Sequence, residues 1–212
     1  RSGSGFIGRH APDFLNFNDT WSQTLNQLYD QDGSVYVIDW YDKNQCHHNR
    51  EDGHDRSNGR IYKIVYNNQP MTRVDVAKLS EAELVKLVPS KNEFLSRHAR
   101  RVLQERAERG LQAASTSELR RMVREASDTP ARLRALWALH VTGGLDARTG
   151  IENLKSSDEW LRAWTIQLAF ESEANLRRLV QEANDAGLRA DPDLNQLAET
   201  DPSPLVRLFI AA

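Results

Sequence analysis

Thiol, imidazole and carboxylate side chains are concentrated in one stretch of this sequence, between residues 33 and 66. The group with potential metal-binding or acid–base chemistry is Asp39, Asp42, Cys46, His47, His48, His54 and Asp55. These side-chain types are the usual protein ligands of zinc and other transition metals. In an extended segment Cys46 and His48 would point the same way, and His54 could close a site from across the loop. One hypothesis is therefore a divalent-metal site formed by Cys46, His48, His54 and Asp55.

Other interpretations of this stretch stay open, because its spacing matches no standard zinc signature. In one, the loop is structural, and its His and Asp side chains bond to the backbone and fasten two strands to the helices that follow. In another, His54 is a general base. The pattern supplies no nucleophile or oxyanion donor to accompany it, and adjacent residues such as Asp55 rarely orient each other. No catalytic residue is assigned, so whether the chain is an enzyme stays open.

A second candidate site is a basic helix face in the middle of the chain. Its proposed binding residues are Arg97, Arg101, Arg120 and Arg124. Such a strip could bind phosphates, nucleic acid or an acidic protein partner. The alternative is a solvated helix surface, because carboxylates are interleaved with the arginines. The interleaved residues are Glu105, Glu108, Glu118 and Glu125. No aromatic residue lies between the arginines to stack bases, which disfavours single-stranded nucleic acid as the partner.

Three tryptophans in the second half, Trp137, Trp160 and Trp164, could line a ligand groove. Their helical spacing favours the alternative, in which they pack between stacked helices. His98 and His140 also fall on apolar helix faces, which indicates packed core histidines.

Composition sets wide bounds on function. The chain has 212 residues, a net charge of −2 and 39% apolar residues, within the usual range of globular domains. That charge provides no general attraction to nucleic acid or anionic membranes. Cys46 is the single cysteine, so an internal disulfide and a C-x-x-C-H haem motif are both excluded. No apolar run approaches the ~20 residues that span a bilayer.

Two strands are predicted around the reactive stretch, over residues 35–40 and 60–66, because both runs are rich in β-branched and aromatic residues. Turn signals precede each of them, at residues 31–33 and 57–59. Residues 20–29 could form a helix or a strand. A two-stranded sheet is marginal alone, so we expect strand 35–40 to expose an apolar edge unless other strands cover it.

After Pro70 the apolar period changes from 2 to 3.6, which predicts helices to the end of the chain. Helices are expected over residues 81–88, 92–109, 117–126, 149–154 and 176–183, and after caps at Asp128, Asp158 and residues 201–204. Helix starts with similar sequences recur about every 30–43 residues, which is typical of HEAT or armadillo repeats. The predicted fold class is a mainly α, HEAT/armadillo-like superhelix over residues 71–212, preceded by a small β-rich segment over residues 1–70.

The β-rich part also resembles a known family. GFIGRHAPDFLNFNDTW, DGSVYVIDWYDKNQCHH and HDRSNGRIYKIVY, followed by helical repeats, resemble the membrane-bound dehydrogenase proteins of planctomycete-type bacteria. In that family a β-propeller similar to glucose and sorbosone dehydrogenases precedes HEAT repeats and often a c-type haem domain. The resemblance covers residues 6–66, and the helical remainder only in kind. It implies that residues 33–66 belong to a final propeller blade and that the chain is a piece of a larger, extracytoplasmic protein.

These patterns favour a helical-repeat interaction module that is not catalytic by itself, with the remaining propeller blades and a protein as its partners. The resemblance implies a parent dehydrogenase that uses quinone and c-type haem. One alternative function is that residues 39–55 form an edge of the parent's sugar or alcohol site. A second is phosphate or nucleic-acid binding through the arginine face.

Overall fold

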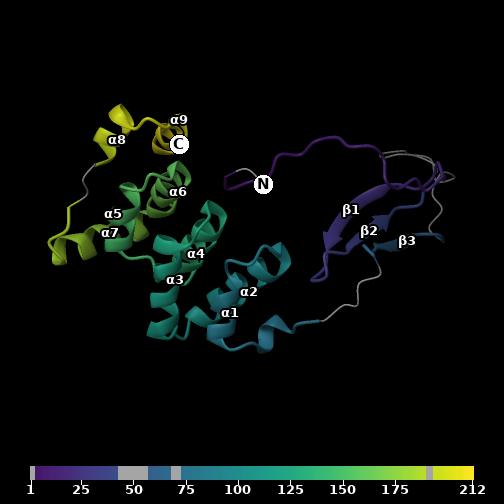
Figure 1. The fold of residues 1–212 in the computed structure, drawn as a ribbon, viewed down its shortest axis with the longest axis horizontal. Helices are drawn as coiled ribbons and strands as arrows, with labels where there is room; N and C mark the ends of the chain where they lie inside the picture. The colour runs from purple at the N-terminus through teal and green to yellow at the C-terminus, as the bar shows by residue number, and fades with distance from the viewer. Residues whose placement is uncertain (1–2, 43–56, 68–72, 190–192) are drawn as a thin grey trace. The chain divides into compact units, whose positions relative to one another are not determined.

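The computed structural model describes residues 3–42, 57–67, 73–189 and 193–212. The chain divides into two compact units, each of which is described by itself. One unit consists of residues 8–75 and contains the strands (Figure 1). The other consists of residues 76–212 together with residues 1–7 and contains the helices. The prediction of a mainly α fold with a small β segment near its N-terminus is confirmed.

The β unit is a three-stranded antiparallel sheet in the order β1-β2-β3. The strands are β1 (Thr24–Tyr29), β2 (Val35–Asp39) and β3 (Arg60–Ile64). The turn between β1 and β2 forms where the sequence predicted it, with Gly33 at φ +80°. Its carbonyl partner is Asp30, which accepts from the Gly33 N–H at 3.1 Å. The left-handed backbone at Gly33 explains why a glycine stands there.

Strand β2 lies in the middle of this sheet, so other strands cover both of its edges and it exposes no apolar edge. The ambiguous residues 20–29 supply the missing neighbour, because β1 pairs with β2 from Thr24 opposite Asp39 to Tyr29 opposite Val35. The exposed apolar surface is instead a sheet face. Ile38 and Ile61 are directly opposite each other on β2 and β3, and both side chains are exposed.

The helical unit starts with a short 3₁₀ helix at Val76–Lys78 and continues in helices to its end. The helices are α1 (Glu81–Leu87), α2 (Glu93–Ala107), α3 (Ala113–Glu125), α4 (Thr129–Val141), α5 (Ala147–Leu154), α6 (Glu159–Ala169), α7 (Glu173–Asp185), α8 (Leu194–Thr200) and α9 (Pro204–Ala211). Most agree with the sequence prediction. Helix α3 begins earlier than residue 117, and α8 was not expected.

The helices form two layers. One layer is the series α2, α4, α6 and α9, each packed against the next, and partner helices α1, α3, α5 and α8 pack against them in turn. Helix α7 packs against α5 and α6. Fully buried leucines from both layers fill the core, including Leu84, Leu103, Leu119, Leu136 and Leu161.

The helices of the first layer start alike, which explains the similar sequences found at their starts. Their N-cap side chains are Asn92, Asp128, Asp158 and Ser203, and each accepts a hydrogen bond from a backbone N–H of the first turn. Such caps satisfy N–H groups that have no partner within the helix.

Polar contacts also join successive helices of this layer. Arg134 of α4 pairs with Glu93 of α2. Thr129 of α4 donates to Asp158, the cap of α6, at 2.6 Å. These contacts fasten α2 to α4 and α4 to α6.

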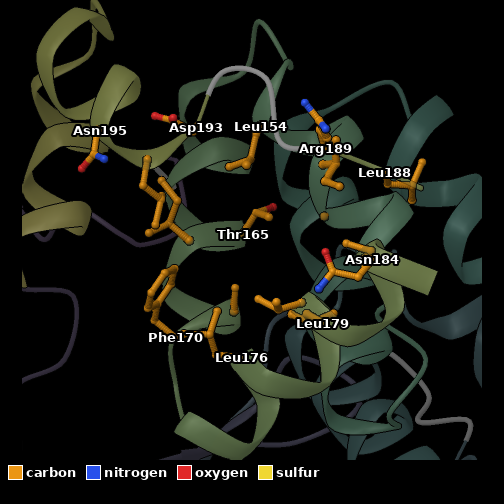
Figure 2. Close-up of a pocket in the computed structure, with 18 residues that line it drawn as sticks. Leu154, Thr165, Phe170, Leu176, Leu179, Asn184, Leu188, Arg189, Asp193 and Asn195 are labelled. Atoms are coloured by element: carbon orange, nitrogen blue, oxygen red, sulfur yellow. The ribbon is translucent and has the colours of Figure 1, made fainter. Parts of the chain in front are cut away.

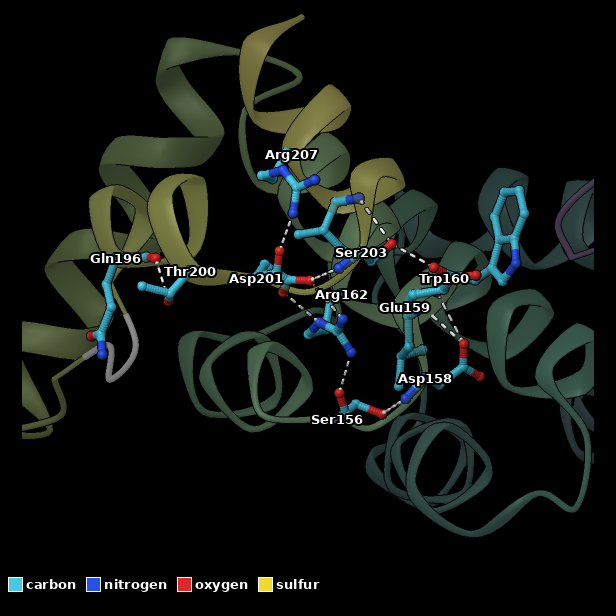
Figure 3. A network of polar contacts seen from close by, with 12 residues as sticks. Ser156, Asp158, Glu159, Trp160, Arg162, Gln196, Thr200, Asp201, Ser203 and Arg207 are labelled. Atoms are coloured by element: carbon cyan, nitrogen blue, oxygen red, sulfur yellow. Dashed lines mark hydrogen bonds and ion pairs between the residues drawn. The ribbon is translucent and has the colours of Figure 1, made fainter.

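The third contact of this kind joins α6 to the segment before α9 (Figure 3). Arg162 donates from Nε and Nη2 to the two carboxylate oxygens of Asp201, both at 2.8 Å. Its Nη1 donates to the Ser156 carbonyl at 2.7 Å. Both members of the pair are buried, so this network supports the fold and leaves no free donor fork for a ligand.

Candidate functional site

The predicted metal ligands Cys46, His48, His54 and Asp55 lie outside the described residues. Within the part of the chain that the structure describes, no cluster of three His, Cys, Asp or Glu side chains could hold a metal ion. The metal hypothesis therefore stays a prediction.

Two other members of that group, Asp39 and Asp42, are buried acceptors in the β unit. Asp39 accepts from the Ser22 hydroxyl at 2.9 Å, from the Gln23 N–H at 2.8 Å and from Arg60 Nε at 3.0 Å. The Asp42 carboxylate accepts from the indole N–H of Trp40 at 3.2 Å. The bonds to Asp39 tie residues 22 and 23 to β2 and β3, and the bond to Asp42 is local, so both carboxylates have structural roles.

The four predicted binding arginines do not form one free basic strip. Arg97 pairs with Glu93 at 3.2 Å, and Arg101 pairs with Glu105 at 2.8 Å. Arg120 pairs with Asp146 at 3.0 Å and also donates to the Gly144 carbonyl. Arg124 is exposed on α3. Much of the charge in this region is thus matched by carboxylates.

Arg97 and two other arginines line a cleft of about 630 Å³ between α2, α4 and α6, which we call the arginine cleft. Its basic side chains are Arg97, Arg100 and Arg134. Two tryptophans, Trp137 of α4 and Trp164 of α6, also line it. The cleft combines positive charge with flat apolar surface, a combination suited to an anionic group on an organic partner.

Arg100 is the unusual member of this cleft. It is half-buried, and its guanidinium lies 5.4 Å from the centre of the Trp137 ring. No ion pair to Arg100 forms among the described residues, in contrast to Arg97 beside it. Burial lowers the pKa of Arg100 from its ordinary value, the charges of Arg97 and Arg134 lower it further, and the charge of Glu93 acts in the opposite direction. An incoming anion would offset the repulsion of Arg100 by Arg97 and Arg134.

Arg134 forms the buried wall of the cleft. It donates to the Pro89 carbonyl at 3.3 Å and pairs with Glu93. Its Nε is buried without a hydrogen-bond partner. Glu93 thus serves both Arg97 and Arg134, and the three arginines outnumber the carboxylates that pair with them.

The two cleft tryptophans pack edge to face, with ring centres 5.1 Å apart. Both indole N–H groups are buried without a partner. Trp137 and Trp164 therefore pack between helices, as their spacing indicated, and they also line a groove. Trp160 is not among the residues that line the cleft.

The two histidines on apolar faces differ in their surroundings. His98 is half-buried and stacks on Phe94, with ring centres 3.9 Å apart. His140 is half-buried at the cleft and contacts the exposed carboxylate of Glu171. Packing describes His98, whereas His140 also has a charged partner in Glu171. That partner could not be predicted from the sequence, because Glu171 follows α6 and approaches α4 only in the fold.

Polypeptide already passes along the arginine cleft. Residues 4–6, which belong to the helical unit and lie outside its helices, contribute to the cleft lining. This contact shows that non-helical backbone fits beside α2, α4 and α6.

Sequence reasoning found Arg97 but chose Arg101 where the structure has Arg100. Helical spacing does not separate Arg100 from Arg101, because each lies three or four residues from both Arg97 and Gln104. The packing of α2 against α4 is what brings Arg100 to Trp137. Gln104 also lines the cleft. The role of Arg134 depends on the packing of α4 against α2, for which the sequence held no local signal.

A second cavity of about 630 Å³ lies among α5, α6, α7 and α8 (Figure 2). Aliphatic side chains such as Leu154 and Leu179 form most of its walls. Figure 2 shows the Thr165 side chain at the middle of this apolar lining. Thr165 is 3% exposed, and its hydroxyl has no hydrogen-bond partner.

Comparisons with known proteins assign no family. No protein-family model, curated protein or solved structure matches this chain. Among the described residues, no helix has the length and apolar character to cross a bilayer.

Proposed function

We propose that this chain is a helical-repeat interaction module of the HEAT or armadillo type, and that its arginine cleft binds an acidic segment of a protein partner. The observation that carries the proposal is Arg100, a half-buried cation over Trp137 with no ion pair among the described residues. Hydrogen bonds to charged groups are stronger than neutral ones. A glutamate or aspartate side chain would supply the carboxylate that Arg100 lacks.

Two features favour a polypeptide over a nucleic acid. Residues 4–6 show that non-helical backbone is accommodated in the cleft. Glu93 and Glu171 also line it, and their charges would repel a continuous chain of phosphates. A segment with a single carboxylate carries less charge and meets less of this repulsion.

The test is a binding titration with a fluorescein-labelled glycine–serine peptide that carries one glutamate, followed by anisotropy. Arg100→Gln is expected to weaken binding about 10- to 100-fold, the loss of one charge-assisted hydrogen bond. Arg124→Gln is the matched control, because it removes the same charge from an exposed position on α3. Equal weakening by both variants, or no binding by the unaltered chain at low salt, would contradict the proposal.

The resemblance of residues 6–66 supports placing this module in a dehydrogenase-like protein. The exposed apolar pair Ile38 and Ile61 is consistent with a propeller blade, whose sheet faces are covered by neighbouring blades. A protein containing the whole propeller is expected to reduce a dye acceptor with a sugar or alcohol and quinone, whereas this chain alone is not. Turnover by this chain alone would contradict an interaction-only role.

A further inference from the structure

We infer that the cavity among α5, α6, α7 and α8 is a binding site for an uncharged, mainly apolar small molecule that carries one carbonyl oxygen. This inference is independent of the arginine cleft and goes beyond the proposed interaction function. It rests on the unpaired hydroxyl of Thr165, on the apolar lining and on the balanced charges at the edge.

The lining determines the bulk of the ligand. Side chains from four helices face the cavity, and Leu154, Ile166, Leu179 and Val180 give it aliphatic walls. The volume of about 630 Å³ lies within the range of sites that hold small organic ligands. Apolar contact over such walls favours a hydrocarbon body.

Thr165 determines the polar group of the ligand. A buried hydroxyl without a partner costs free energy, and a partner oxygen removes that cost. Thr165 is 3% exposed and its Oγ1 is unpaired. A carbonyl oxygen can accept its hydrogen bond. A buried carboxylate would also accept it, but one hydroxyl does not compensate the loss of water around a full charge.

The polar residues that the structure describes at the cavity carry no net charge. Arg189 and Asp193 carry opposite charges, and Asn184 and Asn195 are neutral. In Figure 2, Asp193 and Asn195 lie on one side of Thr165, and Asn184 and Arg189 lie on the other. The Asp193 carboxylate is also engaged as the cap of α8, where it accepts from the Gln196 N–H. The electrostatics therefore select neither an anion nor a cation.

The experiment uses the whole chain and three probes of equal length: 2-undecanone, undecane and undecanoate. Binding is measured by displacement of the neutral apolar dye Nile red. We expect the ketone to bind more tightly than the alkane and the carboxylate. Equal binding of ketone and alkane would overturn the role of Thr165, and tighter binding of the carboxylate would overturn the selection for a neutral ligand.

Thr165→Val separates a ligand contact from a structural one, because the two side chains have nearly the same shape. It is expected to weaken 2-undecanone about three- to tenfold, leave undecane unchanged and raise the melting temperature of the ligand-free protein. If the hydroxyl were structural, Thr165→Val would instead lower the melting temperature. Equal weakening of 2-undecanone and undecane would contradict the proposal.

Ala183→Phe tests the location of the site. Ala183 lines the cavity, so the added ring is expected to fill it and abolish displacement of Nile red by the ketone. Ala174→Phe is the matched control, because residue 174 is exposed on the same helix and is not among the cavity-lining residues. Retained ketone binding in Ala183→Phe would place the ligand elsewhere and refute the assignment.

Discussion

Replacement of Asp201 by asparagine tests how the last helix is held to the rest of the helical unit. Both residues of the Arg162–Asp201 pair are buried, at 7% and 4% exposure. Removal of one partner from such a pair leaves the other charge without compensation and costs about 3–5 kcal/mol. Since whole domains are stable by only about 5–15 kcal/mol, this loss is large. Asparagine keeps the oxygen that accepts from the Ser203 N–H, so the change is confined to the ion pair.

The loss should appear first as local unfolding. Helix α9 packs against α6 and α8, and Asp201 precedes it directly. In helical stacks each element is stabilised mainly by its neighbours, and terminal elements open separately. Hydrogen exchange of Asp201→Asn should therefore accelerate in α8 and α9, over residues 194–211, while amides of α2 and α4 keep their protection. Urea unfolding followed by circular dichroism gives the free energy.

Two further variants make the result interpretable. Arg162→Met combined with Asp201→Leu removes both charges and is expected to cost much less than either single change, because no charge is left buried. Glu173→Gln removes one partner of the exposed Arg177–Glu173 pair and should cost about 0–1 kcal/mol. A cost below about 1 kcal/mol for Asp201→Asn, with additive effects in the double variant, would refute the structural role of the pair.

Three other changes have definite expected outcomes. Burial tends to raise the pKa of Asp201, but hydrogen bonds from Arg162 and the Ser203 N–H outweigh it, so its pKa lies below the ordinary aspartate value of 3.8. The stabilisation from Asp201 should therefore be complete above pH 3.8 and lost as the pH falls through the lower folded pKa. Acid unfolding of Asp201→Asn should lack this component. Ser80→Ala removes the capping box of α1 and should cost about 0.5–2 kcal/mol in urea unfolding, and an unchanged midpoint would contradict the cap. Gly33→Ala imposes a side chain on a backbone with φ +80° and should destabilise the β unit by about 1–2 kcal/mol, measured by exchange of β2 amides; unchanged β2 protection would contradict this turn geometry.

Helix starts were the part of the fold most accessible from the sequence. Asn92, Asp128 and Asp158 each precede an apolar run, and each accepts a first-turn hydrogen bond as the capping rules predict. These signals are local, because a cap and its partner N–H are separated by two or three residues. Local chemistry can be recognised without knowing the packing.

Elements stabilised mainly by distant neighbours were harder to predict. Helix α8 has only Leu194 and Leu197 as large apolar residues, too few for a helical period, and its Leu197 joins a core cluster with Val206 of α9. The strand β1 was ambiguous because all six of its residues are exposed, and its pairing with β2 decides its conformation.

The arginines show most clearly why the candidate site could not be found from composition. Arg101 and Glu105 form an exposed pair one turn apart, which sequence spacing predicts. The pair of Arg162 with Asp201 joins residues 39 positions apart in the sequence, which only the fold reveals.

Arg100 differs from both in having no ion pair among the described residues and in facing Trp137. Three arginines of one helical unit thus have three roles: Arg101 at the surface, Arg162 in the structure and Arg100 in a candidate binding site. Whether a carboxylate lies within reach is what separates these roles, because a paired guanidinium has already exchanged water for protein whereas Arg100 has lost water without that exchange. An unpaired, half-buried arginine is therefore a stronger indication of a binding site than a high density of arginines along a helix.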